Sequence, residues 1–147
     1  MKKMKCIWVD IDGTMSNTDH RQHHRKPPKN YRAFNDGMVL DPPHDEIIWL
    51  VKTLYLAGHQ VVVCTGRDEK FRVWTTVWLE QHGVPFDALY MAPENDNRSD
   101  AIIKLELLEQ MQKDGYDPYI FLEDRQRVVD ALRAIGKKVL QVAPGDF

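Results

Sequence analysis

Two aspartates, Asp10 and Asp12, stand one residue apart at the end of an apolar run that begins at Cys6, and Gly13 and Thr14 follow them. Side chains two residues apart in a β-strand point to the same face, so both carboxylates would lie together at the strand's carboxyl end. Buried carboxylates repel each other and are costly to desolvate, and a divalent cation that neutralises one of them removes most of that penalty. The motif is typical of a metal-dependent phosphoryl-transfer site.

The two acids suggest a two-step reaction. A carboxylate such as Asp10 can attack phosphorus and hold the phosphoryl group as an aspartyl phosphate. Asp12 could protonate the leaving oxygen and then deprotonate the water that cleaves the intermediate. A hard cation such as Mg²⁺ would bridge Asp10, a phosphate oxygen and a further carboxylate, for which Asp124 is the natural candidate.

Other residues of the chain could hold the phosphate. Thr65 ends a second apolar run, and its hydroxyl, with the backbone N–H groups around Gly66, would bind phosphate oxygens. Lys104 lies five residues after Ser99, in the first turns of an expected helix, from which its ammonium could offset the charge of Asp10. Taken alone, Lys104 would be read as a solvated helix lysine, so its role depends on the residues around it.

Strands and helices that position these residues are expected to alternate along the chain. The expected strands are 6–11, 60–64, 86–91, 119–122 and 138–142, and the expected helices are 43–57, 69–82, 99–113 and 126–135. This order predicts an α/β domain over residues 1–147, with a five-stranded, mostly parallel sheet covered by helices on both faces. In such sheets the active site lies beyond the carboxyl ends of the strands. Three polar clusters fall at these expected ends: Asp10/Asp12, Thr65-Gly66-Arg67 and Glu123-Asp124.

Residues 15–39 break this pattern, because they show no clear period. Five Arg or Lys residues and no acid lie between His20 and Asn35. A long irregular stretch in a compact domain is usually functional or disordered. We therefore expect a basic insertion at about 15–40 that overhangs the site, with Arg25 and Arg32 as candidate substrate-binding residues and Arg21 as a third possibility.

Bulk properties narrow the class of protein. The net charge of −2 argues against a generally basic nucleic-acid coat but leaves room for a local basic patch. Cys6 and Cys64 would lie about 13 Å apart in a parallel sheet, too far for a disulfide, which suits a reducing cytoplasm. No signal peptide or membrane span is expected. The helical spacing of Trp49, Trp74 and Trp78 predicts that they pack in the core.

Four elements together resemble the haloacid dehalogenase (HAD) superfamily. The match rests on Asp10-Ile-Asp-Gly-Thr14, Thr65, Lys104 and Glu123-Asp124, in that order over most of the chain. This resemblance implies a Rossmann-like HAD fold with a cap inserted after the first or third strand. Here only the 15–40 insertion, a minimal cap, is available.

Several further segments are similar to the phosphatase half of the phage polynucleotide kinase/3′-phosphatase family. They are residues 61–67, 71–72, 78–79, 82–85, 98–104, 124–129 and 141–147. The 147 residues hold no Gly-x-x-x-x-Gly-Lys-Ser/Thr loop, so we expect the phosphatase half alone, without the kinase half and its ATP site. The likeness also suggests a phage or bacterial source.

The resemblance assigns roles residue by residue. It implies Asp10 as nucleophile and Asp12 as general acid/base, with Lys104 beside them. It also implies phosphate contacts from Thr65, Gly66 and Arg67, metal ligands from the carboxylates of Asp10 and Asp124 and the backbone carbonyl of Asp12, and supporting roles for Asp100, Glu123, Gly13 and Thr14. Two departures stand out: the family usually has Asp-Asp where this chain has Glu123-Asp124, and the 15–39 segment is longer and more basic than its counterpart.

Three hypotheses for the function follow. The first is a Mg²⁺-dependent phosphatase that removes 3′-phosphates from DNA or RNA ends, because no expected cap is large enough to close the site to a polymer. The second is a small-molecule nucleotide phosphatase in which the basic segment is a lid. The third is a nucleotide-binding protein without turnover, which Asp10 and Asp12 argue against because binding needs no nucleophile. The expected partners are thus nucleic-acid 3′ ends or nucleotides, in the cytoplasm.

Overall fold

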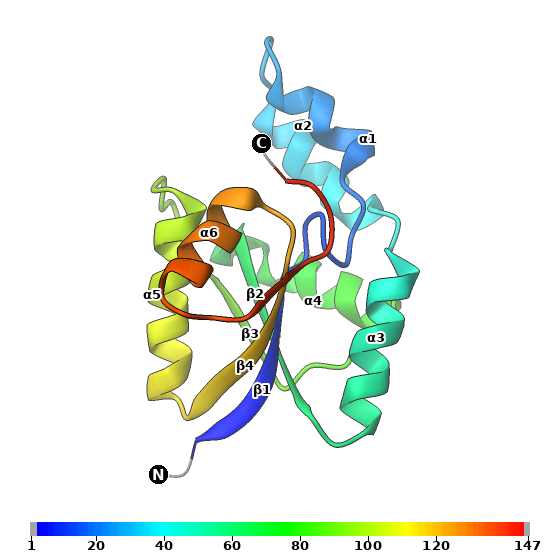
Figure 1. Cartoon of the computed structure of the whole chain (residues 1–147). Helices are drawn as coiled ribbons and strands as arrows, with labels where there is room; N and C mark the ends of the chain where they lie inside the picture. The colour runs from blue at the N-terminus through cyan, green and yellow to red at the C-terminus, as the bar shows by residue number, and fades with distance from the viewer. Residues whose placement is uncertain (1–2, 146–147) are drawn as a thin grey trace.

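A computed structural model of the chain describes residues 3–145 (Figure 1). Met1 and Lys2 lie outside this range, as do Asp146 and Phe147, the last two residues of a segment that carried the family likeness. No helix within the described part of the chain is both long and apolar enough to cross a membrane.

Five parallel strands form one sheet in the order β3-β2-β1-β4-β5. The strands are β1 (Met4–Val9), β2 (Gln60–Asp68), β3 (Ala88–Ala92), β4 (Tyr116–Glu123) and β5 (Val139–Gln141). Cys6 pairs with Gln60 in the β1–β2 register, four residues before Cys64, and both cysteines are free and buried, as expected. The expected α/β fold with a five-stranded sheet is confirmed.

Helices cover both faces of the sheet (Figure 1). The helices of the core are α3 (Asp45–Leu56), α4 (Arg72–Gln81), α5 (Asp100–Lys113) and α6 (Gln126–Ala134). On one face, Val9 and Val63 pack with Ile48 of α3 and Trp78 of α4. On the other face, Trp8, Val62 and Cys64 pack with residues of α5 and α6. Alternating side chains of the central strands therefore feed two separate cores, which explains why these strands are apolar throughout.

Some element boundaries differ from the expectation for clear reasons. Strand β2 continues to Asp68 rather than ending at Cys64. The apolar pattern stops at Cys64 because the residues after it are polar, but Thr65 and Arg67 are nevertheless buried at the site. Strand β4 begins at Tyr116 rather than at Tyr119; β5 pairs only with its last residues, so Pro118 leaves no N–H missing on that side.

Residues 15–40 are helical rather than irregular. They contain α1 (Asp19–Gln22), the 3₁₀ turn η1 (His23–Arg25), α2 (Tyr31–Asp36) and the 3₁₀ turn η2 (Gly37–Leu40). These helices and turns are too short to show a helical period in the sequence, so the hydrophobic pattern did not predict them. They stack above the carboxyl end of the sheet, drawn in blue and cyan in Figure 1. We call residues 15–40 the cap segment.

The prediction for the tryptophans was right for one of the three named on helices. Trp78 is buried and donates from its indole Nε1 to the backbone carbonyl of Asp41, at 2.9 Å. Trp49 and Trp74 lie on the outer sides of α3 and α4 and are 66% and 41% exposed. Spacing alone placed them in the core, but each helix buries a narrower stripe than its apolar residues suggest.

Candidate active site

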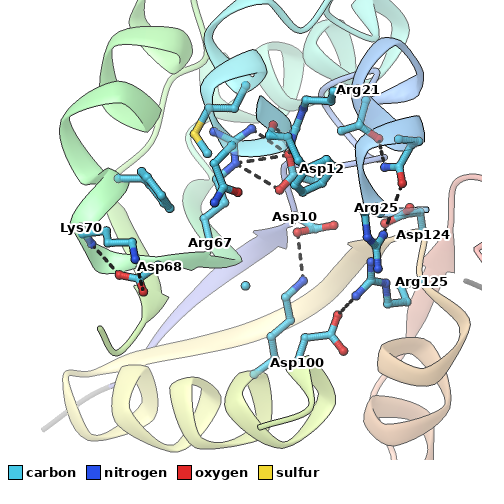
Figure 2. Close-up of a pocket in the computed structure, with 18 residues that line it drawn as sticks. Asp10, Asp12, Arg21, Arg25, Arg67, Asp68, Lys70, Asp100, Asp124 and Arg125 are labelled. Atoms are coloured by element: carbon cyan, nitrogen blue, oxygen red, sulfur yellow. Dashed lines mark hydrogen bonds and ion pairs between the residues drawn. The ribbon is translucent and has the colours of Figure 1, made fainter. Parts of the chain in front are cut away.

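A cavity of about 320 Å³ lies at the carboxyl ends of the strands, under the cap segment (Figure 2). The core contributes the turn after β1, the end of β2, the start of α5 and the turn after β4, and the cap segment contributes α1, η1 and α2. Asp10, Asp12 and Asp124 line it together with Lys104. The rim predicted from strand ends therefore forms a single site.

Asp10 lies on the floor of this cavity, and its backbone N–H donates to the carbonyl of Leu122 on the neighbouring strand β4. The Lys104 ammonium donates to Asp10 Oδ1 at 2.9 Å and to Glu123 Oε1 at 2.7 Å. Trp8 also donates to Glu123 Oε1, at 3.0 Å. Lys104 is buried, so it is an ion-pair partner of Asp10 and not a solvated helix lysine.

Asp124 lies beside Asp10, and the buried Thr14 hydroxyl is within 3.4 Å of Asp10 Oδ2 and 3.3 Å of Asp124 Oδ1. Gly13 has a φ of 83°, and a Cβ built there would lie 2.0 Å from Asp124 Oδ2. Glycine is therefore required at this turn both by the backbone conformation and by the closeness of the carboxylate.

Carboxylate oxygens of Asp10, Glu123 and Asp124 lie within 4.8 Å of one another. We call these three residues the acid cluster. Three carboxylates face the one Lys104 ammonium, and Glu123 Oε2 is buried without a hydrogen-bond partner. Burial and then the Asp10 carboxylate raise the pKa of Glu123 to about 8, and the same two causes raise the pKa of Asp124 to about 8. Excess negative charge, an unpartnered oxygen and oxygen-only donors fit a hard divalent cation such as Mg²⁺.

The sequence predicts that Asp10 and Asp12 lie together and that a cation neutralises at least one of them. In the structure the side chain of Asp12 stays outside the acid cluster, and Glu123 takes its place. Asp12 instead accepts hydrogen bonds from Arg67, at 2.7 Å from Nη2, and from Arg21 Nη2, at 2.8 Å. Strand β1 ends at Val9, before either aspartate, yet both aspartates line the same cavity, as their spacing predicts.

Arg21 and Arg67 also bind a second carboxylate. Asp41 accepts from Arg21 Nε and Nη2, both at 2.8 Å, and lies 3.5 Å from Arg67 Nη2. His20 Nε2 is 2.7 Å from Asp41 Oδ1. We call Asp12, Asp41, Arg21 and Arg67 the arginine network. It ties the cap segment to the core, because Arg67 belongs to β2 and the other arginine to α1.

The arginine network fixes the charge of Asp12, whose side chain is 37% exposed to the cavity. Burial alone would raise the pKa of the Asp12 carboxyl, but the ion pairs with Arg67 and then Arg21 hold it well below its usual range. Asp12 is therefore a carboxylate in this state of the protein, the form in which it can accept a proton.

The other predicted residues are placed as follows. Thr65 is fully buried, and its hydroxyl accepts the backbone N–H of Arg67 at 3.2 Å, whereas Gly66 lines the cavity. Asp100 binds neither Lys104 nor the acid cluster; it pairs with Arg125 at 2.5 Å and with Arg127 at 2.6 Å.

The arginines of the cap segment separate clearly. Arg25 lines the cavity, while Arg32 is 92% exposed and lies 3.8 Å from Asp36 on the outside of α2. Arg21, which the sequence offered only as a third possibility, is buried in the site. Asp41 and Arg125 were missed. Asp41 directly follows the cap segment and stands before two prolines, and nothing in its sequence surroundings marks it as buried.

A Rossmann-like parallel sheet with a buried aspartate, a lysine partner and an acid cluster at its carboxyl rim defines a phosphatase of the haloacid dehalogenase superfamily. A solved structure shares this fold. The chain is similar to the class C acid phosphatase from Bacillus anthracis, with a TM-score of 0.71 and 16% identity over 99% of this chain and 68% of that chain. At that identity the likeness shows the fold alone.

The family is narrower than the superfamily. A family model described as the polynucleotide kinase PNKP phosphatase domain matches residues 4–147, so the chain belongs to this family of phosphomonoesterases. It is also similar to a chain in a structure of a Pnkp1/Rnl/Hen1 complex, with 30% identity and a TM-score of 0.86, and to one in a Pnkp1/Rnl/Hen1 RNA repair complex, with 29% and 0.82. It is covered over 99% of its length in both matches but spans only 47% and 44% of those chains.

Proposed function

We propose that this phosphatase removes phosphate from the 3′ ends of nucleic acid strands, with Mg²⁺, through an aspartyl phosphate on Asp10. The observation that carries the proposal is that Asp10 shares one cavity with Arg67 of the core and Arg21 of the cap segment. Phosphate oxygens are matched by such guanidinium groups, which bind them in bidentate fashion. Membership of the PNKP phosphatase family supports a nucleic acid substrate.

The first chemical step is attack by an Asp10 carboxylate oxygen on the terminal phosphorus. The P–O bond to the 3′ carbon's oxygen breaks, and that oxygen takes a proton from Asp12. In the second step water attacks phosphorus, Asp12 accepts the water proton, and the bond to Asp10 breaks to release inorganic phosphate. Lys104, 2.9 Å from Asp10 Oδ1, offsets the negative charge that gathers there.

The acid cluster would hold the metal ion through Asp10, Glu123 and Asp124, and the backbone carbonyl of Asp12 remains a proposed fourth protein ligand. A bound Mg²⁺ supplies positive charge to phosphate oxygens and so reduces repulsion between the phosphate and the carboxylates. Thr14 and Gly13 support this arrangement, the first by bridging two ligands and the second by leaving room for Asp124.

Asp12 must be protonated to act in the first step. In the present state Arg67 and Arg21 keep it ionised. A phosphate in the cavity competes with Asp12 for these two guanidiniums, and each one that turns to the phosphate weakens its hold on the Asp12 carboxylate. Substrate binding thus favours the protonated form that the first step needs.

The test is phosphate release from three matched substrates with Mg²⁺: a 3′-phosphorylated oligonucleotide, the same oligonucleotide phosphorylated at its 5′ end, and nucleoside 3′-monophosphates. Both DNA and RNA versions are needed, since the similar Pnkp1 chains come from complexes one of which is described as an RNA repair complex. We expect release from the 3′ end only, lost in Asp10→Asn and kept in Asp130→Asn, which changes an exposed aspartate of α6.

Two results would contradict the proposal. If the protein releases phosphate from nucleoside monophosphates but not from the 3′-phosphorylated oligonucleotide, it is a nucleotide phosphatase with the cap segment as its lid. Tight nucleotide binding without release of phosphate from any substrate would make it a binding protein.

A further inference from the structure

Two arginines that the proposed chemistry does not use meet at one side of the cavity. Arg25 lies in η1 of the cap segment, and Arg125 directly follows Asp124 after β4. Both line the cavity, and Figure 2 shows them side by side next to Asp124, on the opposite side of Asp10 from Arg67. Residues that are 100 positions apart in the sequence thus bring two positive charges to the same edge of the site.

Of the two arginines, Arg25 has no carboxylate partner among the described residues. Arg25 donates to the neutral side-chain oxygen of Gln22 at 3.3 Å, and among residues 3–145 no carboxylate lies within 4 Å of its guanidinium. The carboxylate of Asp100 is shared by Arg125 and Arg127. Burial lowers the pKa of Arg25, and the charges of Arg125 and Arg127 lower it further.

Two guanidinium groups next to each other at the edge of a cavity repel each other, and an anion bound between them would relieve that repulsion. The arginine network shows the contrast, because there two guanidiniums already have two carboxylates. A phosphodiester has one negative charge and two free oxygens, which two guanidiniums can bind from either side. Such a group occurs one nucleotide before the 3′-terminal phosphate of every nucleic acid strand.

Resting on the proposed function, we propose that Arg25 and Arg125 together bind the phosphodiester that precedes the 3′-terminal nucleotide. This second phosphate site lies one nucleotide away from the phosphate that Asp10 attacks. It gives the enzyme a reason to prefer a strand end over a free nucleoside 3′-monophosphate, which has no second phosphate. Because one arginine comes from the cap and the other from the core, the strand would also hold the two parts together.

The test compares two 3′-phosphorylated DNA dinucleotides that differ only at the internal linkage. One has the natural phosphodiester and the other a methylphosphonate, which is neutral but has nearly the same shape. For the unaltered protein we expect kcat/KM to be about tenfold higher for the phosphodiester, the effect of a charge-assisted contact. In Arg25→Gln and in Arg125→Gln this ratio falls to about one or two.

Lys29→Gln is the matched control, since it removes one positive charge from an exposed position of the cap segment outside the cavity. The tenfold ratio stays in this variant if Arg25 acts by contact and not through the general charge of the cap. A ratio near one in the unaltered protein, or a ratio that Arg25→Gln leaves at tenfold, would overturn the proposal.

Failure of the proposed function gives a different result. If the unaltered protein releases phosphate from neither dinucleotide, the 3′-phosphatase assignment is wrong. Calorimetric measurement of how tightly each dinucleotide binds then tests the second phosphate site without relying on turnover. Tighter binding of the phosphodiester by about tenfold, lost in Arg25→Gln, supports the site, and equal binding of the two dinucleotides refutes it. Circular dichroism of each variant shows whether it has folded.

Discussion

The acid cluster and the arginine network both contribute residues to the same cavity, and both hold buried charges, but they differ in charge balance. The arginine network matches two guanidiniums with two carboxylates, and Asp41 accepts hydrogen bonds on both of its oxygens. The acid cluster sets three carboxylates against one ammonium and leaves Glu123 Oε2 without a partner. The first group pairs its guanidiniums with carboxylates from the chain, whereas the second holds more carboxylates than Lys104 can pair with.

This difference separates a structural task from a chemical one. A balanced buried network holds the cap segment to the core before any ligand arrives. An unbalanced one destabilises the fold until a ligand offsets its charge, and this excess negative charge is the reason we propose that the site binds a cation. Neutral variants of the acid cluster should therefore lose chemistry and keep the fold. In the arginine network, a neutral variant of Asp41, the member that the proposed chemistry does not use, should lose stability.

The largest effect is expected for Asp10→Asn, on the acid-cluster side. Phosphate release should fall by about 10⁴-fold or more, because an amide cannot form the acyl phosphate. The free energy of unfolding of the metal-free protein should not fall, because one of three crowded carboxylates is removed. Initial rates and urea unfolding measure the two quantities. Activity within tenfold of the unaltered protein would show that the nucleophile is another residue.

Asp41→Asn should have the next largest effect, in stability. It leaves the buried Arg21 and Arg67 with Asp12 as their one carboxylate partner among the described residues. Losing one member of a buried ion pair destabilises a protein by about 3–5 kcal/mol. Urea unfolding at pH 7 checks this value. Asp36→Asn, in the cap segment and with a 55% exposed side chain, serves as the control and should change stability by less than about 0.5 kcal/mol. Equal effects of the two variants would contradict the structural role of the arginine network.

The sequence predicted the acid cluster better than it predicted the arginine network. Asp10, Asp124 and Lys104 follow or face the ends of buried strands, so local pattern and the family motif located them, along with the sheet and its two apolar faces. The arginine network depends on Asp41 and Arg21, which lie in short helical pieces without a period. Their partners are set by how the cap segment folds onto β2, and no local pattern contains that information.

For Arg32 and Glu123, the position in the structure differs from the role that the sequence predicted. Arg32 had the right chemistry and the right segment, but α2 turns it outward to Asp36. Glu123 was expected only to support the site, yet its carboxylate stands in the acid cluster with Asp10 and Asp124. In both cases side-chain direction decided the outcome, and direction in a short helix or at a strand end depends on tertiary packing.

A third prediction concerns pH, with and without Mg²⁺. The pKa values of Glu123 and Asp124 are raised to about 8, so between about pH 5 and 8 the folded protein binds more protons than the unfolded chain. The stability of the metal-free protein must therefore fall as the pH rises through this interval. We expect a loss of at least about 1.4 kcal/mol, the value of one pKa unit.

Excess Mg²⁺ should reduce this loss, because the ion takes the place of the proton, and its affinity should rise with pH for the same reason. Asp12 does not interfere, since its lowered pKa affects stability only at more acidic pH. Thermal unfolding with EDTA and with Mg²⁺ at each pH gives both quantities. Parallel pH profiles in the two conditions would mean that the metal binds elsewhere.

The smallest expected effect is the most selective test of the comparison, and it concerns Glu123→Gln. The amide oxygen can keep the hydrogen bonds from Trp8 and Lys104, and the amide nitrogen takes the position of the unpartnered Oε2. The variant should be more stable than the unaltered protein by about 1 kcal/mol at pH 8 in EDTA, because a buried charge is gone. It should also bind Mg²⁺ more weakly, since one negative charge of the acid cluster is lost. Urea unfolding in EDTA and Mg²⁺ titration test the two halves separately. A loss of stability in EDTA would show that the negative charge of Glu123 is needed to hold Lys104, and that the acid cluster, like the arginine network, is already complete without a cation.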